Sequence, residues 1–200
     1  MTQEELTTKD KIIEVAHKLF ADKGFNGASI REIAKEASVN IAAINYHFGN
    51  KESLYSATIS NCMFKMRSDL ENIYHPGLTT AELSILYYEH LISNKNDLVT
   101  SFKLFLDIDN ESLSIGEEDK TIGPPGGAIL FKCIQAEVPE ATIENIHWAV
   151  RVIFIQIIHT ALLMCNHSDE VCKNTGMTTE DMKNQIRKTV NLFIKEIHCE

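Results

Sequence analysis

The chain has 200 residues, of which 44% are hydrophobic and 24% charged, with five cysteines and a formal net charge of −9 at pH 7. This length suits one domain or a small domain joined to a larger one, and the apolar content is sufficient for a buried core. An odd number of cysteines without a C-x-x-C pair argues against a disulfide framework. Reduced thiols and a cytoplasmic location are therefore expected.

The charge is distributed unevenly along the chain. Residues 1–58 contain seven Lys and Arg against eight Asp and Glu, a balance of −1, which leaves −8 of the total −9 for residues 59–200. An acidic surface repels polyanions, so any nucleic-acid contact is expected in the near-neutral N-terminal part. The sequence does not open with a basic and then apolar leader, and no signal peptide is predicted.

The first two predicted helices have recognisable start and stop residues. Apolar residues recur at helical spacing in the first, for which Thr8 is the expected N-cap and Gly24 the expected end. The second begins at Ser29, and Ser29 with Glu32 forms the pattern of a capping box.

A third and a fourth helix follow after short polar breaks. Asn40 is the expected N-cap of a short helix over residues 41–47, which carries no formal charge. Asn50 is the expected N-cap of a longer helix over residues 51–74, which precedes a proline.

The rest of the chain also has helical periodicity. Further helices are predicted over residues 79–93, 97–108, 128–137, 139–166 and 178–198. Residues 109–127, rich in Gly, Pro, Ser and acids, are expected to form a loop. The apolar run at residues 150–164 is shorter than the roughly 20 residues of a membrane span, so it predicts a buried helix and no membrane partner. Since no alternating strand pattern competes, the expected fold class is all-α.

Two short helices joined by a tight turn, at residues 29–48, are typical of a helix-turn-helix, whose second helix enters the DNA major groove. Helix pairs occur in any all-helical protein, however. From the pattern alone, three packed helices that only hold the N-terminus remain an alternative.

Four blocks of residues closely resemble the tetracycline-repressor (TetR) family over about the first 60 residues. They are FADKGF at 20–25, SIREIA at 29–34, VNIAAINYHF at 39–48 and KESLY at 51–55. The resemblance implies a three-helix DNA-binding domain at residues 1–58 and a helical ligand-binding and dimerisation domain at residues 59–200. It also implies a homodimeric repressor that binds palindromic double-stranded operator DNA and is released by a small-molecule effector.

The residues expected at the DNA are those that the predicted packing leaves outward, and they agree with the family pattern. They are Ser29, Asn40, Ala42, Ala43, Asn45, Tyr46, His47 and Lys51. Alanine methyls can touch thymine methyls, asparagine can bond adenine in bidentate fashion, and tyrosine, histidine and lysine can donate to phosphates. Many family members have an aromatic residue where this chain has Asn45, and some have a basic residue near position 41. Base preferences therefore cannot be transferred.

The C-terminal helices supply the candidates for effector binding and dimerisation. Aromatic and methionine residues of the middle helices could line an effector cavity, although most such residues are core: Met63, Met66, Tyr87, Phe102, Phe105 and Trp148. The last two helices are expected to build a dimer interface, with the alternative of a larger core within one chain: Ile153, Ile157, Ala161, Met164, Ile186, Val190, Phe193 and Ile197.

Other motifs favour structural interpretations. Acidic residues at 107–118 only faintly match a calcium loop, and His159, Cys165 and His167 lack the spacing of a metal site. Neither a P-loop nor a nucleophile motif is found, so no enzyme, metal or cofactor is predicted. The open alternatives are an activator or ligand-independent DNA binder, a helical enzyme whose site is assembled from distant residues, and an interaction module that has lost DNA binding.

Overall fold

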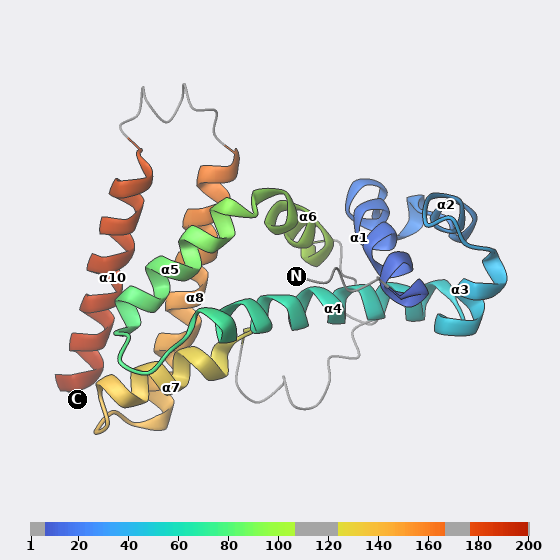
Figure 1. The fold of residues 1–200 in the computed structure, drawn as a ribbon. Coiled ribbons are helices and arrows are strands. Elements are labelled where there is room, and N and C mark those ends of the chain that lie inside the picture. Colours follow the sequence, from blue (N-terminus) through green and yellow to red (C-terminus); the bar gives the residue numbers. More distant parts are fainter. Residues whose placement is uncertain (1–6, 107–123, 167–176, 200) are drawn as a thin grey trace. The chain divides into compact units, whose positions relative to one another are not determined.

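In a computed structural model of the chain, the secondary structure of the described residues consists of helices (Figure 1). The structure describes residues 7–106, 124–166 and 177–199. The helices are α1 (Thr8–Gly27), α2 (Ile30–Glu36), α3 (Ile41–Phe48), α4 (Lys51–Ile73), α5 (Thr80–Ser93), α6 (Lys95–Leu106), α7 (Gly127–Glu137), α8 (Ile143–Asn166) and α10 (Thr179–Cys199). The predicted all-α class is confirmed.

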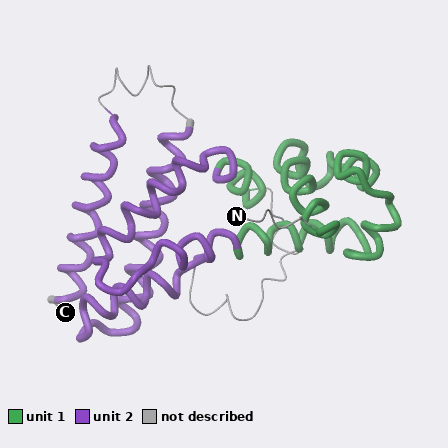
Figure 2. Tube along the Cα trace, viewed as in Figure 1, with its two compact units in different colours: residues 1–64, 99–115 green, residues 65–98, 116–200 purple. Residues whose placement is uncertain are grey.

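The chain divides into two compact units (Figure 2). Unit 1 contains α1 to α3, α4 as far as Phe64, and α6 from Val99 onward. Unit 2 contains the rest of α4, the start of α6, and α5, α7, α8 and α10. The sequence placed the boundary after residue 58, whereas the structural division lies inside α4. Because α4 is one uninterrupted helix, no loop or change in composition marks this division.

One face of each helix builds the core of unit 1. Ile12, Ala16 and Phe20 of α1 are fully buried and pack in one cluster with Ile33 of α2 and Ile44 of α3. Its other members are Leu19, Ala28, Ala34, Ala37, Leu54, Tyr55, Ile59, Cys62 and Leu104. With 7 and 8 residues, α2 and α3 are too short to be stable alone, since isolated helices need roughly 12–15 residues. Packing against this core therefore holds them.

Asparagine caps fix the starts of α3 and α4, as predicted. The Oδ1 atom of Asn40 accepts a hydrogen bond from the Ala43 N–H at 2.7 Å. The Oδ1 atom of Asn50 accepts from the Ser53 N–H, also at 2.7 Å. Each bond satisfies one backbone donor that has no partner inside its helix, which stabilises a helix by about 1 kcal/mol.

The N-cap of α1 is Thr7 instead of the predicted Thr8. The Thr7 hydroxyl accepts from the Asp10 N–H, and the Asp10 carboxylate accepts from the Thr7 N–H. Only Thr7 has an acid three residues later, where a capping box needs one, because Lys11 stands at that position for Thr8. The regular path of α1 is interrupted at Gly24, with φ 70° and ψ 171°, where the sequence predicted its end.

The predicted capping box at α2 is half present. The Ser29 Oγ accepts from the Glu32 N–H at 3.2 Å. The Glu32 carboxylate instead pairs with the ammonium of Lys23, and this hydrogen bond raises the pKa of the lysine. The side chain of Glu32 thus links α2 to α1 within unit 1.

Helix α8 of unit 2 packs against α5, α7 and α10. It starts at Ile143 and not at residue 139, because the Thr142 hydroxyl accepts from the Asn145 N–H at 3.2 Å and caps the helix there. Among the helices that the structure describes, Ile143–Cys165 is the one long and apolar enough to cross a membrane by length and composition. Its packing against three helices accounts for the buried part of that composition.

Six of the eight residues predicted for the dimer interface lie in the core of unit 2, and for these six the prediction needs correction. Within one chain, Ile153, Ile157, Ala161, Ile186 and Val190 are 0% exposed and Ile197 is 3% exposed. Met164 and Phe193 are half-buried. The most apolar stripes of α8 and α10 face each other in the same chain, so they are not free to meet a partner.

A different set of apolar side chains on these two helices is exposed. Trp148 of α8 is 41% exposed, Ile155 of α8 is 66% exposed, and Leu192 of α10 is 68% exposed. We call these three residues the outer apolar face of unit 2. The rings of Trp148 and Phe193 meet edge to face with centroids 5.1 Å apart, which connects the two helices at this face.

Candidate nucleic-acid interface

The outer face of α3 carries side chains that packing does not use. Ile44 is 1% exposed and holds the helix in unit 1, whereas Tyr46 is 85% exposed. Asn45 and His47 are also exposed, and the rings of Tyr46 and His47 meet edge to face at 5.1 Å between centroids. These groups are free to contact phosphates and base edges.

Hydrogen bonds within the protein limit what Asn40 can do at the DNA, whereas Asn45 keeps its whole side-chain amide for contacts. The Oδ1 of Asn40 is engaged by the cap of α3, so this residue can donate through Nδ2 but cannot make the bidentate pair with adenine. Asn45 is exposed in mid-helix, where both of its amide atoms can reach a base. Ala42 is exposed and Ala43 half-buried, and their small size allows the helix to approach the groove closely.

Two further predicted residues stand at helix starts. The Ser29 oxygen accepts the capping bond of α2, which leaves its O–H free to donate to a phosphate. Lys51 is the first residue of α4, and its Nζ lies 4.6 Å from the centroid of the Phe25 ring. In the sequence, Phe25 stands out only as a member of the FADKGF block, because its contact with Lys51 joins residues that only the fold brings together. All eight predicted DNA-contacting residues thus lie in unit 1, at the starts of α2, α3 and α4 or along α3.

The turn between α2 and α3 has the hydrogen bonds of a Schellman motif. The Val39 N–H donates to the Ala34 carbonyl at 2.9 Å, and the Ser38 N–H donates to the Lys35 carbonyl at 3.2 Å. Ser38 has φ 55°, the left-handed conformation in which glycine is usual. This turn sets the direction in which α3 leaves α2.

The six residues predicted to bind an effector are divided between the units. Met63, Phe102 and Phe105 belong to unit 1, while Met66, Tyr87 and Trp148 belong to unit 2. Met63 and Phe105 pack against the core of unit 1, and Trp148 belongs to the outer apolar face. Tyr87 is the member that is fully buried in unit 2.

The hydroxyl of Tyr87 is an uncompensated polar group. The side chain is 0% exposed, and among the described residues its oxygen has no hydrogen-bond partner. Burial raises the pKa of the phenol, and the negative charge of Asp69 raises it further. A buried hydroxyl without a partner costs about 1–3 kcal/mol, so this group is available to a bound molecule.

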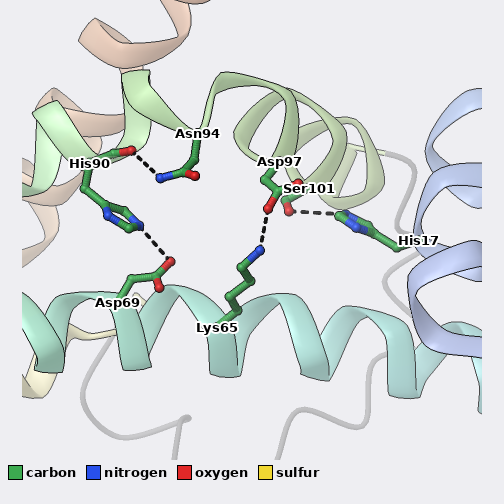
Figure 3. A network of polar contacts seen from close by, with 7 residues as sticks. All are labelled: His17, Lys65, Asp69, His90, Asn94, Asp97 and Ser101. Atoms are coloured by element: carbon green, nitrogen blue, oxygen red, sulfur yellow. Dashed lines mark hydrogen bonds and ion pairs between the residues drawn. The ribbon is translucent and has the colours of Figure 1, made fainter. Parts of the chain in front are cut away.

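Polar contacts connect α4 to its neighbours within unit 2 (Figure 3). Lys65 pairs with Asp97, and the Asp69 carboxylate lies 3.2 Å from the His90 ring nitrogen. Lys65 and Asp69 are four residues apart and therefore lie on one side of α4. Both pairs are partly exposed, where such contacts contribute about 0–1 kcal/mol, so they are weak enough to rearrange.

The other motifs of the sequence yield no site in the structure. The acidic segment at residues 107–118 and His167 lie outside the described residues. Within the described part of the chain, no three His, Cys, Asp or Glu side chains gather as metal ligands would.

Comparison with known proteins identifies the N-terminal part. Residues 12–58 match the model of the family described as bacterial regulatory proteins, tetR family. The HTH-type transcriptional regulator YttP of Bacillus subtilis is 54% identical over 56 residues, 28% of this chain and 27% of that protein. IcaR of Staphylococcus epidermidis, a negative transcriptional regulator of a biofilm operon, is 36% identical over 75 residues, 35% of this chain and 40% of that protein. The matches thus span less than half the length of these relatives.

A solved structure extends the likeness to the fold of the whole chain. A tetR family regulator from Shewanella sp. PV-4 matches with a TM-score of 0.68 at 18% identity, over 92% of this chain and 98% of that chain. At this identity the likeness concerns the fold alone. Residues 12–58 thus match the tetR family of bacterial regulatory proteins, and the fold of the chain is similar to that of the Shewanella protein.

Proposed function

We propose that the protein is a homodimeric transcriptional repressor that binds a palindromic operator through α3 and leaves it when a small molecule binds unit 2. The observation that carries the proposal is the outer face of α3, where Tyr46, Asn45 and His47 are exposed beside Ala42. The named function of IcaR as a negative regulator supports repression. Such a protein would act in the cytoplasm, where the DNA is.

Recognition by this helix uses few charges. Asn45 and Ala42 would read base edges and methyl groups, and Tyr46, His47 and Lys51 would contact phosphates. No arginine lies on the helix, so bidentate reading of guanine from α3 is excluded. The specificity would therefore come from adenine and thymine positions and from DNA shape.

Selection of bound genomic fragments tests the DNA-binding part of the proposal. The wild type should enrich a palindrome, whereas Tyr46→Ala should enrich none. Because Tyr46 is 85% exposed, this substitution should leave the fold intact. The exposed Lys132 of α7 supplies a control, since Lys132→Ala should enrich the same palindrome as the wild type.

We propose that the outer apolar face of unit 2 meets the same face of a second copy. Trp148 and Ile155 are seven residues apart and point in nearly one direction from α8, and Leu192 lies on the neighbouring α10. An isologous dimer buries such a face against itself and presents two reading helices to the two halves of a palindrome.

Sedimentation at micromolar concentration tests the dimer. Ile155→Asp and Leu192→Asp should convert a dimer to a folded monomer. The matched control is Ile143→Asp, because Ile143 is 64% exposed on the same helix but lies about 120° around it from Ile155. A wild type that is monomeric, or a control that dissociates equally, contradicts the proposed face.

Release by an effector is proposed to involve Tyr87. A largely apolar molecule with one hydrogen-bonding group would satisfy the buried hydroxyl and shift the population toward a conformation that fits the operator poorly. A thermal-shift screen of such molecules should find compounds that stabilise the wild type more than Tyr87→Phe and that release the selected DNA. Failure of every stabilising compound to release DNA would favour the alternative of a ligand-independent binder or an activator.

A further inference from the structure

We infer that Phe25 is a positioning residue of the DNA interface, whose ring holds the Lys51 ammonium ready for a phosphate. The Lys51 Nζ lies 4.6 Å from the centroid of the Phe25 ring, within the roughly 6 Å range of a cation–π contact. The inference rests on the proposed DNA-binding function, and it adds a residue that never touches the DNA.

Neighbouring aromatic residues hold the Phe25 ring in place. Its centroid lies 5.0 Å from that of Tyr55 and 6.2 Å from that of Phe20, and both of these residues are buried. The change of backbone direction at Gly24, with φ 70°, turns the chain immediately before Phe25. The ring under Lys51 is therefore packed on the side of Phe20 and Tyr55, while it is only partly buried and stays accessible to the cation.

A lysine at a protein surface normally samples many conformations, and binding a phosphate must immobilise it. Contact with a ring face reduces this loss because the ammonium is already confined before DNA arrives. The ring offers no acceptor oxygen, so the three N–H donors of Lys51 remain available to phosphate oxygens. Among the described residues, none of the ion pairs engages Lys51 with a carboxylate that a phosphate would have to displace.

A purely structural role of Phe25 makes a different prediction. If the ring only fills the space beside Phe20 and Tyr55, its loss weakens DNA binding whether or not Lys51 is present. If the ring acts through the ammonium, its loss matters only while residue 51 carries the cation. A double-mutant cycle separates these two cases.

The cycle measures the affinity of wild type, Phe25→Leu, Lys51→Met and the double variant for the palindrome selected from genomic fragments, at one salt concentration. Phe25→Leu should weaken binding about twofold to fivefold for each α3 helix on the DNA. For a palindrome bound by the two α3 helices of a dimer, the loss is roughly fourfold to 25-fold. In the Lys51→Met background the same change should have no effect. Phe25→Tyr, which keeps the ring, should restore wild-type affinity, and thermal unfolding should show that every variant is folded.

A second series removes the electrostatics of the ring and keeps its shape. Phenylalanines with one, two and three ring fluorines at position 25 weaken the negative ring face progressively. DNA affinity should fall in the same order. Two results overturn the inference and leave the proposed DNA-binding function standing. One is a DNA affinity that stays constant across the fluorinated series, and the other is an equal loss on Phe25→Leu in the wild-type and Lys51→Met backgrounds. Absence of any DNA binding by the wild type overturns both.

Discussion

Replacing Tyr87 with phenylalanine should stabilise the protein, although the residue is buried. The change removes a hydroxyl that lacks a partner among the described residues and keeps the ring in place. Since an unpaired buried hydroxyl costs about 1–3 kcal/mol and the deletion leaves only a small void, the expected gain in the free energy of unfolding is about 1 kcal/mol at pH 7. Urea unfolding of Tyr87→Phe against wild type measures it, with Tyr46→Phe as the exposed control, which should change by less than about 0.5 kcal/mol.

Alkaline pH adds a second, independent readout for Tyr87. Its pKa in the folded protein is raised by burial, so the folded state keeps a proton that the unfolded state loses above pH of about 10. The contribution of Tyr87 to the free energy of unfolding is therefore fully present below that pH. Above it, this contribution falls by about 1.4 kcal/mol per pH unit. At pH 11 the advantage of Tyr87→Phe over wild type should have widened by about 1.4 kcal/mol. Lower stability of the variant than of wild type at pH 7 would show that the hydroxyl is paired, and no widening at high pH would show that it is solvated. Either result would refute the reasoning.

The remaining predictions concern unit 1. Ser38→Gly should stabilise the protein by about 0.5–1 kcal/mol, because the left-handed φ of 55° at this position suits glycine. Ser38→Val should destabilise it by at least about 1 kcal/mol, because a β-branched residue does not adopt this φ. Urea unfolding measures both changes. Asn50→Ala should cost about 1 kcal/mol through the lost cap of α4, and Asn50→Asp should restore it. The DNA affinity should depend only moderately on salt, with a log–log slope of about −0.9 for each phosphate neutralised; a slope near −10 would contradict an interface with so few cations.

Much of unit 1 could be predicted from the sequence because its determinants are local. The caps at Asn40 and Asn50 involve residues three positions apart, and the spacing of Ile33 and Ile44 already marks the buried faces of α2 and α3. The predicted Thr8 cap is wrong by one residue, because a capping box needs an acid three residues after the cap, which Thr7 has in Asp10 and Thr8 lacks.

The proposed dimer face could not be predicted in the same way. Periodicity shows that α8 is apolar on several sides, but it does not tell which side faces the same chain. Ile153 and Ile157 are fully buried in one chain, whereas Ile155, equally apolar and between them in sequence, is 66% exposed. Only the packing of α5, α7 and α10 on α8 distinguishes them.

Contacts between distant residues were likewise beyond the sequence. Nothing in the spacing of Phe25 and Lys51 indicates that a ring and an ammonium meet. That the Tyr87 hydroxyl has no partner among the described residues depends on every side chain packed around it. The division inside α4 is also not visible in the sequence, since a continuous helix needs no change in composition where two units join.

The most direct test of the central claim compares the affinities of the wild type for the selected palindrome and for a random duplex of equal length, at one salt concentration. Specific recognition by α3 predicts a ratio of at least about 10³. Asn45→Ala should lower this ratio, whereas Lys51→Ala should weaken both affinities alike and leave the ratio unchanged. A wild-type ratio near one, or a ratio that Asn45→Ala does not change, would contradict sequence reading by this helix.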